Sequence, residues 1–81
     1  MELTARTAQQ VGEALRRMRK ARGWTQRDIS ARTNLRVATI SSLENGEGGV
    51  KLVTVLSVMT ALGLEFHITE RGGALEIEDI F

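Results

Sequence analysis

The stretch LRVATISSLENG, residues 35–46, decides the fold that is predicted for this chain of 81 residues. Read as a helix, it places Leu35, Ile40 and Leu43 on one side. The opposite side carries small or uncharged side chains, namely Val37, Ala38, Ser41, Ser42 and Asn45. A helix face that meets only water usually carries charged residues instead. We therefore expect another molecule to lie closely against this face.

Two helices are predicted upstream of this stretch. TAQQ, residues 7–10, has the spacing of a capping box, and it predicts a helix over residues 8–22 that ends at Gly23. The residues expected to face inward from it are Val11, Leu15 and Met18. TQRD, residues 25–28, repeats the start signal with Thr25 as the N-cap and predicts a second helix over residues 26–32. Ile29 and Ala31 are expected to face inward from this second helix.

The chain turns at Asn34, and a third helix is predicted over residues 37–45. After GEGG, residues 46–49, a fourth helix is predicted over residues 51–62. One side of it carries Leu52, Val55, Met59 and Leu62. The rest of its circumference is also apolar, with Val53, Leu56 and Val58. A small core cannot cover so much apolar surface, and a second contact surface is therefore expected.

After Gly63 the hydrophobic period changes from helical to two. Leu64, Phe66 and Ile68 alternate with polar residues, which predicts a strand over residues 64–69. ALEIEDIF, residues 74–81, alternates again. Two uses of the first strand remain open, a hairpin with residues 74–81 and pairing with a second copy of the chain. Acidic and apolar residues together also suit residues 65–81 to docking on another protein, with a hairpin folded back on its own domain as the alternative.

Composition limits the chemistry of the chain. It has no Cys and one His, which excludes a disulfide and a thiolate or multi-imidazole metal site. Residues 1–45 hold nine Lys or Arg against four Asp or Glu, whereas residues 46–81 hold two against six. This separation favours a basic face for a polyanion. We expect no cofactor, no metal and no membrane contact, and a cytoplasmic location, since no signal peptide or membrane-spanning run is seen.

The presence of several residues can be explained by structure as well as by function. Trp24 is expected to fill the core, and His67 to pair with a carboxylate. The basic residues of the first helix are expected to form a solvated surface, with one or two of them touching phosphate: Arg16, Arg17, Arg19, Lys20 and Arg22. Ser41 and Ser42 have no base placed beside them by any motif, and alternation separates Asp79 from Glu76 and Glu78. The chain is therefore not expected to be an enzyme.

Two short helices joined by a tight turn, the second with a bare face, match the helix-turn-helix design, in which the second helix enters the major groove of DNA. GWTQRDISARTNLRVATISSLENG, residues 23–46, resembles the Xre-type helix-turn-helix family, which includes phage repressors and Cro proteins. The resemblance implies a mainly α, lambda-repressor-like bundle of four to five helices, here with a short C-terminal strand or hairpin. Residues 1–63 would form the DNA-binding domain, and residues 64–81 would serve dimerisation or partner binding.

The resemblance also implies which residues meet double-stranded DNA. They are Gln26, Arg36, Val37, Ala38, Thr39, Ser41, Ser42 and Asn45. The chain departs from the family pattern in three places. Asn34 stands where Gly is common, GEGG replaces a loop that often contains Pro, and Val37 replaces a polar residue. Direct reading of bases is therefore expected to depend more on Arg36 and Ser41.

The strand LEFHIT, residues 64–69, makes the chain similar to HipB-like antitoxins. That resemblance implies a homodimer and a HipA-like kinase toxin as partner. The residues expected at the dimer interface are Val53, Leu56, Val58, Leu64, Phe66 and Ile68. A repressor acting as a homodimer on a palindromic operator, and as an antitoxin, is the predicted function. The alternatives are a stand-alone Xre-family regulator and a protein-binding adaptor that does not bind DNA.

Overall fold

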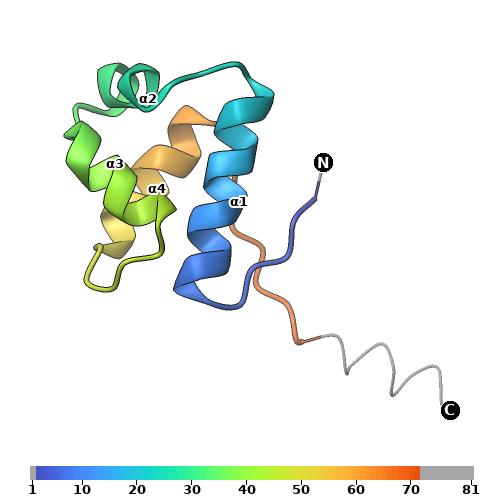
Figure 1. Cartoon of the computed structure of the whole chain (residues 1–81). Coiled ribbons are helices and arrows are strands. Elements are labelled where there is room, and N and C mark those ends of the chain that lie inside the picture. Colours follow the sequence, from blue (N-terminus) through green and yellow to red (C-terminus); the bar gives the residue numbers. More distant parts are fainter. Residues whose placement is uncertain (1, 72–81) are drawn as a thin grey trace, which may run out of the picture.

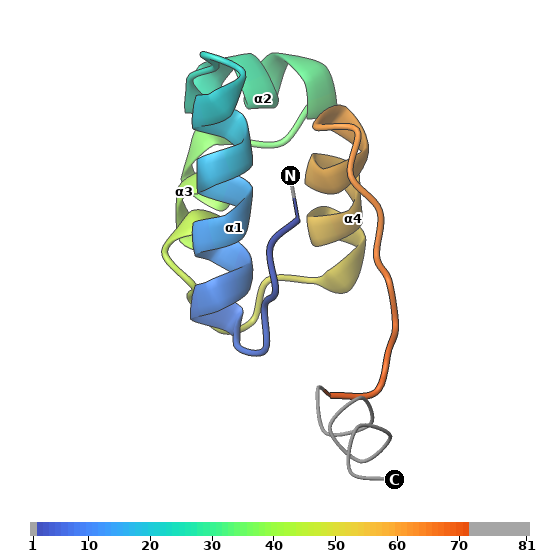
Figure 2. The same cartoon turned by 90° about the vertical axis from the view of Figure 1, so that its right-hand side faces the viewer.

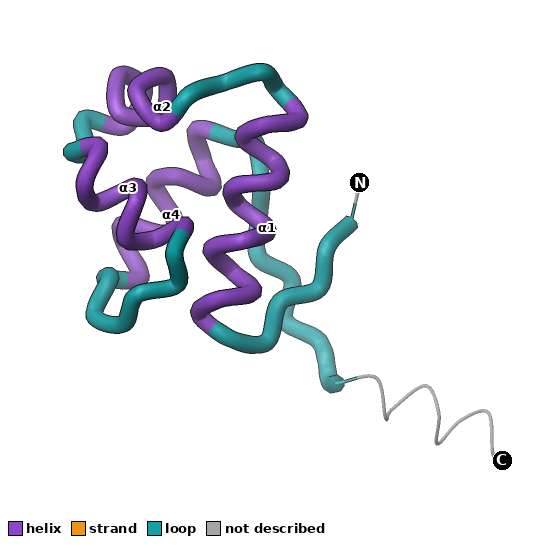
Figure 3. The backbone as a smooth tube through the Cα atoms, viewed as in Figure 1, coloured by secondary structure: helices purple, strands orange, loops and turns teal. Residues whose placement is uncertain are grey.

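The computed structural model describes residues 2–71, and this part of the chain folds into four helices (Figures 1 and 3). They are α1 (Ala8–Ala21), α2 (Gln26–Thr33), α3 (Val37–Glu44) and α4 (Leu52–Ala61). The predicted mainly α bundle is confirmed, and each helix boundary lies within a residue or so of the predicted one. None of these helices combines the length and the apolar character that crossing a bilayer requires.

Local side-chain contacts explain where the helices begin and end. The Thr7 hydroxyl accepts a hydrogen bond from the Gln10 backbone N–H, and Gln10 reaches back to the backbone N–H of Arg6 rather than to that of Thr7. At α2 the capping box is complete, because Thr25 and Asp28 each accept from the other's backbone N–H. Asn34 ends α2 in the left-handed region, with φ of 62°.

The helices enclose one small core. α1 lies beside α3, and α2 lies across the end of the bundle, where it contacts both α3 and α4 (Figures 1 and 2). The buried apolar side chains of this core are Leu15, Met18, Ile29, Ile40, Leu43, Val58, Met59 and Leu62. Ile29 and Ile40 are fully enclosed, which fixes α2 and α3 relative to each other through apolar packing.

Glycine allows an unusually close approach between α1 and the end of α3. A Cβ atom at Gly12 would lie 2.3 Å from the backbone oxygen of Leu43 and 2.6 Å from that of Glu44. Gly46, just after α3, has φ of 72°, and a Cβ there would lie 2.6 Å from the Cα of Gln9. The position of α3 on the bundle therefore depends on two residues without side chains.

Two predicted placements, those of Ala31 and Val58, are wrong. Ala31 is exposed rather than inward-facing, because α2 directs Ile29 alone into the core. On α4, Leu52 is 64% exposed, whereas Val58, expected at a dimer interface, is 2% exposed in the core. The pattern of α4 is apolar nearly all round, and the sequence therefore could not select which of its sides faces α2.

The predicted strand over residues 64–69 is not formed within the described chain. These residues run along the bundle without strand pairing (Figure 2). A strand needs a hydrogen-bonding partner, and no other segment of residues 2–71 supplies one. The proposed hairpin partner, residues 74–81, and the acidic residues Glu76, Glu78 and Asp79 lie outside the described residues.

Candidate nucleic-acid interface

The outer face of α3 is exposed and almost free of charge. Ile40 and Leu43 point into the core, while Val37, Ala38 and Asn45 are exposed and Thr39, Ser41 and Ser42 are half-buried. Glu44, the only charged residue among residues 37–45, is 8% exposed and faces the interior. The predicted division of this helix into a core face and a bare face is thus confirmed.

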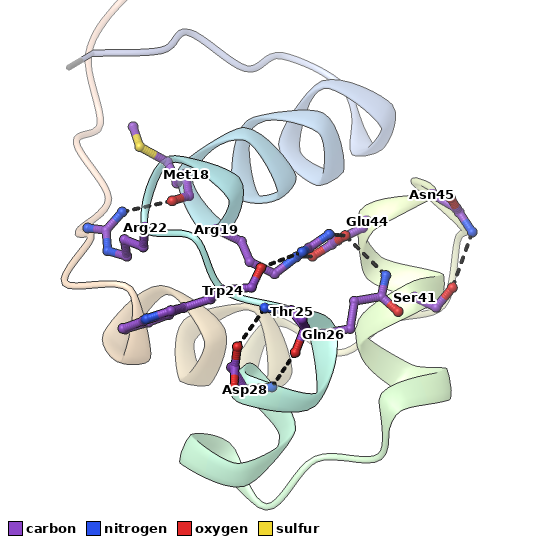
Figure 4. A network of polar contacts seen from close by, with 10 residues as sticks. All are labelled: Met18, Arg19, Arg22, Trp24, Thr25, Gln26, Asp28, Ser41, Glu44 and Asn45. Carbon is purple, nitrogen blue, oxygen red and sulfur yellow. Dashed lines mark hydrogen bonds and ion pairs between the residues drawn. The ribbon is translucent and has the colours of Figure 1, made fainter.

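The start of α3 brings a positive charge to this face. Arg36 is exposed and occupies the N-cap position with an extended backbone, directly before Val37. Further along the helix, the amide nitrogen of Asn45 lies 3.5 Å from the Ser41 hydroxyl oxygen, at the limit of a hydrogen bond (Figure 4). The face therefore offers one cation, three hydroxyls, one amide and short apolar groups. Side chains of these kinds can contact base edges and phosphates.

A buried polar network lies behind this face (Figure 4). Arg19 of α1 donates from Nε to Oε2 of Glu44 at 2.7 Å and from Nη2 to Oε1 at 2.9 Å. Its Nη1 donates to the backbone oxygen of Trp24 at 2.7 Å, in the turn before α2. The amide Nε2 of Gln26 donates to Oε1 of Glu44 at 3.1 Å. One carboxylate on α3 thus holds groups from α1 and α2.

The prediction that Arg19 lies on a solvated surface is therefore wrong. It is 8% exposed and forms a bidentate ion pair, the strongest geometry for such a pair. The hydrogen bonds to Glu44 raise the pKa of the Arg19 guanidinium above its ordinary value, and the charge of Glu44 adds to this, while burial opposes it. The remaining basic residues of α1 are exposed: Arg16, Arg17, Lys20 and Arg22.

Trp24 is half-buried against the core, as expected, and two arginine guanidinium groups also lie over its ring. The guanidinium carbon of Arg32 lies 3.8 Å from the ring centroid, and that of Arg22 lies 6.0 Å away. Arg22 also donates to the backbone oxygens of Met18, at 3.0 Å, and of Leu62. It therefore connects the end of α1 to the end of α4. This connection could not be predicted from the sequence, because Arg22 and Leu62 are 40 residues apart along the chain.

A second exposed surface, on α4 and the segment after it, is apolar. Val53 is 64% exposed, Leu56 42%, Phe66 49% and Ile68 98%, whereas Leu64 packs partly against the core. A groove of about 520 Å³ lies between the N-terminal residues, α1 and this segment, and Leu3, Met18 and Phe66 are among its lining residues. Exposure on this scale marks a surface that is suited to an apolar partner.

The His, Asp and Glu side chains of residues 2–71 lie mostly apart from one another. No group of three His, Cys, Asp or Glu side chains gathers there. His67 lies 3.1 Å from Oε1 of Glu65, and both side chains are exposed. The pairing of His67 with a carboxylate agrees with the prediction from sequence.

Comparisons with known proteins agree with this geometry. The sequence profile of a helix-turn-helix domain family matches residues 10–70. Antitoxin HipB of Escherichia coli strain K12 is 28% identical over 65 residues, which are 80% of this chain and 74% of that protein. Putative antitoxin HigA2 of Mycobacterium tuberculosis strain H37Rv is 38% identical over 60 residues, 73% of this chain and 59% of that protein.

The fold is similar to that of a solved structure as well. In the HipB–O4 20mer complex, the HipB chain superimposes with a TM-score of 0.81 at 24% identity, over 86% of this chain and 99% of that one. At this identity the likeness establishes the arrangement of the helices. It extends into the segment after α4, since the match covers more of the chain than the four helices alone.

Proposed function

Because the chain belongs to the helix-turn-helix domain family, as its match over residues 10–70 shows, we propose that it is a sequence-specific DNA-binding transcriptional repressor. The observation that carries this proposal is the bare outer face of α3, whose one acidic side chain is turned into the interior. The major groove admits a helix, and small side chains let its backbone approach the base edges. An acidic group on that face would be repelled by phosphate.

The residues of this interface have distinct proposed roles. Arg36 and Ser41 would read base edges, while Val37 and Ala38 would contact thymine methyl groups. Gln26, Thr39 and Asn45 would bind phosphate, and Ser42 would bond a base or a phosphate. Gln26 lies in the first turn of α2, where backbone N–H groups favour negative charge. The exposed Arg27 and Arg36 add positive charge around the same region.

We propose further that the chain acts as a homodimer on a palindromic operator. The apolar side chains of Val53, Leu56, Phe66 and Ile68 support this because they are exposed to water in the single chain. Leu64, which packs partly against the core, would add its remaining exposed surface to the same interface. Residues 64–69 can pair with the same segment of a second copy in a two-fold arrangement. Such a dimer would set the two α3 helices about one turn of DNA apart, roughly 34 Å.

The similarity to HipB and HigA2 favours a role as the antitoxin of a toxin–antitoxin pair. Residues 1–63 would form the DNA-binding domain, and residues 64–81 would serve dimerisation and partner binding. The proposed partner is a HipA-like kinase toxin. A stand-alone regulator remains the second candidate. The family profile that matches residues 10–70 describes a helix-turn-helix domain and names no toxin.

Selection from a random duplex library, followed by titration of the enriched duplex, tests the DNA-binding proposal. The selected sequence should be a pseudo-palindrome, and the binding constant should fall steeply with salt because phosphate contacts release counterions. Equal affinity for selected and random duplexes, or binding that salt does not change, would reject it. Co-expression with the HipA-like kinase from the same operon, followed by co-purification, tests the antitoxin role. A stand-alone regulator would purify alone.

A further inference from the structure

Glu44 lies on the recognition helix α3 but has no access to the face that is proposed to meet DNA. Its side chain is 4% exposed, and its carboxylate accepts three hydrogen bonds from two other helices. Arg19 supplies two of these and neutralises the charge. The third comes from Gln26, the only member of the trio that reaches the surface (Figure 4).

The bond to Glu44 determines which way the Gln26 amide faces. An ionised carboxylate has only acceptors, and therefore the amide can approach it only through its nitrogen. In Figure 4 the nitrogen of Gln26 points to Glu44 and the oxygen points away from it. One N–H is thereby used, which leaves the second N–H and the carbonyl oxygen for an external partner. A free glutamine would sample several rotamers and both amide orientations.

We propose that Glu44 is a positioning residue of the DNA interface, which fixes the Gln26 amide so that its second N–H is presented to a phosphate of the duplex. This inference rests on the proposed DNA-binding function. A phosphate oxygen is an acceptor and fits that N–H. Because the side chain is ordered before DNA arrives, binding loses less conformational entropy at this contact. The two hydrogen bonds from Arg19 to Glu44 keep the carboxylate in place.

The free protein allows a test that does not depend on DNA. In a ¹⁵N spectrum, the two side-chain amide protons of Gln26 should be widely separated, because one is bonded to a carboxylate and the other is not. Gln9 is exposed and provides the reference in the same spectrum, because the Gln10 side chain accepts from the Arg6 backbone N–H. Glu44→Gln should bring the Gln26 signals toward those of Gln9. An unchanged Gln26 pair in this variant would overturn the proposal.

Titration of the selected duplex tests the effect on binding. Gln26→Ala and Glu44→Gln should each lower affinity about tenfold, as expected for one hydrogen bond to a charged group. The slope of log K against log salt should stay as in the wild type for Gln26→Ala, since a neutral side chain releases no counterion. Glu47→Gln, an exposed change of the same charge just after α3, is the matched control and should not weaken binding.

A double-mutant cycle separates positioning from a merely structural role. If Glu44 acts through Gln26, Glu44→Gln should cost less than twofold in a Gln26→Ala background. Because Glu44→Gln leaves Arg19 buried without its counter-charge, Arg19→Met with Glu44→Leu replaces the pair by apolar groups and keeps the domain folded. This variant should also bind about tenfold more weakly, with no further loss on adding Gln26→Ala.

Two results would overturn the inference while leaving the proposed function intact. One is wild-type affinity in the folded variant without the ion pair, and the other is full additivity of Glu44→Gln with Gln26→Ala. A wild-type chain that binds no duplex would instead reject the proposed function. In that case the amide spectrum would still decide whether Glu44 holds Gln26.

Discussion

The two exposed surfaces of this domain differ in what they need from a partner. The face of α3 exposes short polar groups and a single larger apolar side chain, Val37, at 38%. The face of α4 exposes Leu52 and Val53 at 64% each. Water solvates hydroxyls and amides well, whereas each Å² of exposed apolar surface forgoes about 25 cal/mol of stabilisation. A single chain therefore leaves more apolar surface in water on the α4 face than on the α3 face.

This difference suggests how the proposed functions divide. A preformed polar face, held from behind by the bonds of Glu44, suits rapid and salt-sensitive contact with DNA. An apolar face beside an unpaired extended segment suits a permanent protein contact.

Gly12→Ala should have the largest effect, because it acts on the packing that places α3. The new Cβ would lie 2.3 Å from the backbone oxygen of Leu43, and a backbone atom cannot rotate away. We expect the free energy of unfolding to fall by about 3 kcal/mol, as in severe overpacking. Thermal unfolding followed by circular dichroism measures this. Gly48→Ala, with no atom within 4 Å of the new Cβ, should change little. Equal stability of the two variants would contradict the close packing of α1 on α3.

Phe66→Glu should break the proposed dimer without unfolding the domain. Phe66 is 49% exposed in the single chain, and burying an unpaired carboxylate at an apolar interface costs about 3 kcal/mol, which is roughly a hundredfold in dimer affinity. Sedimentation would detect the monomer, and operator binding should be lost with it. His67→Glu places the same charge on the alternate side of the segment and serves as control. A wild-type chain that is monomeric at micromolar concentration would reject the dimer.

Ser41→Ala should affect DNA recognition alone. The loss of one hydrogen bond to a base edge is expected to cost about 1 kcal/mol, roughly fivefold in affinity, and to relax sequence preference at one position. The melting temperature and the sedimentation behaviour should stay as in the wild type. Ser57→Ala removes a hydroxyl from α4, where it bonds only the backbone oxygen of Val53, and should leave DNA binding unchanged. Equal losses from both variants would remove the distinction between the two faces.

Local signals in the sequence were sufficient for the helices of the DNA-binding region. The N-caps at Thr7 and Thr25 and the left-handed turn at Asn34 are determined by neighbouring residues, and the structure confirms them. The capping box predicted at Thr7 is not complete, because the Gln10 side chain accepts from the backbone N–H of Arg6 instead. Contacts between distant residues were not predictable in this way. Arg19 was assigned to the surface because of its charge, although its spacing of four from Leu15 placed it on the inner side of α1. Its partner Glu44 lies 25 residues further along the chain.

The fourth helix shows a different limit. Because Leu52, Val53, Leu56 and Val58 are all apolar, periodicity alone could not orient α4, and the structure buries Val58 while exposing Leu52. Residues 64–69 alternate as a strand does, but no segment of residues 2–71 pairs with them. Prediction was therefore weakest on α4 and residues 64–69, because their side-chain patterns do not select one orientation or one hydrogen-bonding partner.

The smallest expected effect concerns pH and the start of α2, which carries Gln26 toward the α3 face. The backbone N–H of Thr25 donates to the Asp28 carboxylate at 2.7 Å, and this bond lowers the pKa of Asp28 below its ordinary value, with the Thr25 side chain and Arg32 acting in the same direction. The ionised form thus favours the folded state. Its contribution should be present above about pH 4, the ordinary pKa of Asp, and should be lost as the pH falls through the lowered folded-state value.

Asp28→Asn should therefore melt slightly lower than the wild type near neutral pH and show a smaller fall in melting temperature between about pH 5 and pH 2. Because the carboxylate is accessible to solvent, the difference should be small and should shrink with added salt. Glu13→Gln removes one charge from the exposed side of α1 and is the matched control. The same acid sensitivity in Asp28→Asn and the wild type would show that the capping box at α2 does not couple to pH. If Asp28→Asn changes the DNA affinity at neutral pH while the α4 face and the dimer stay unaffected, the first turn of α2 belongs to the preformed DNA-binding face.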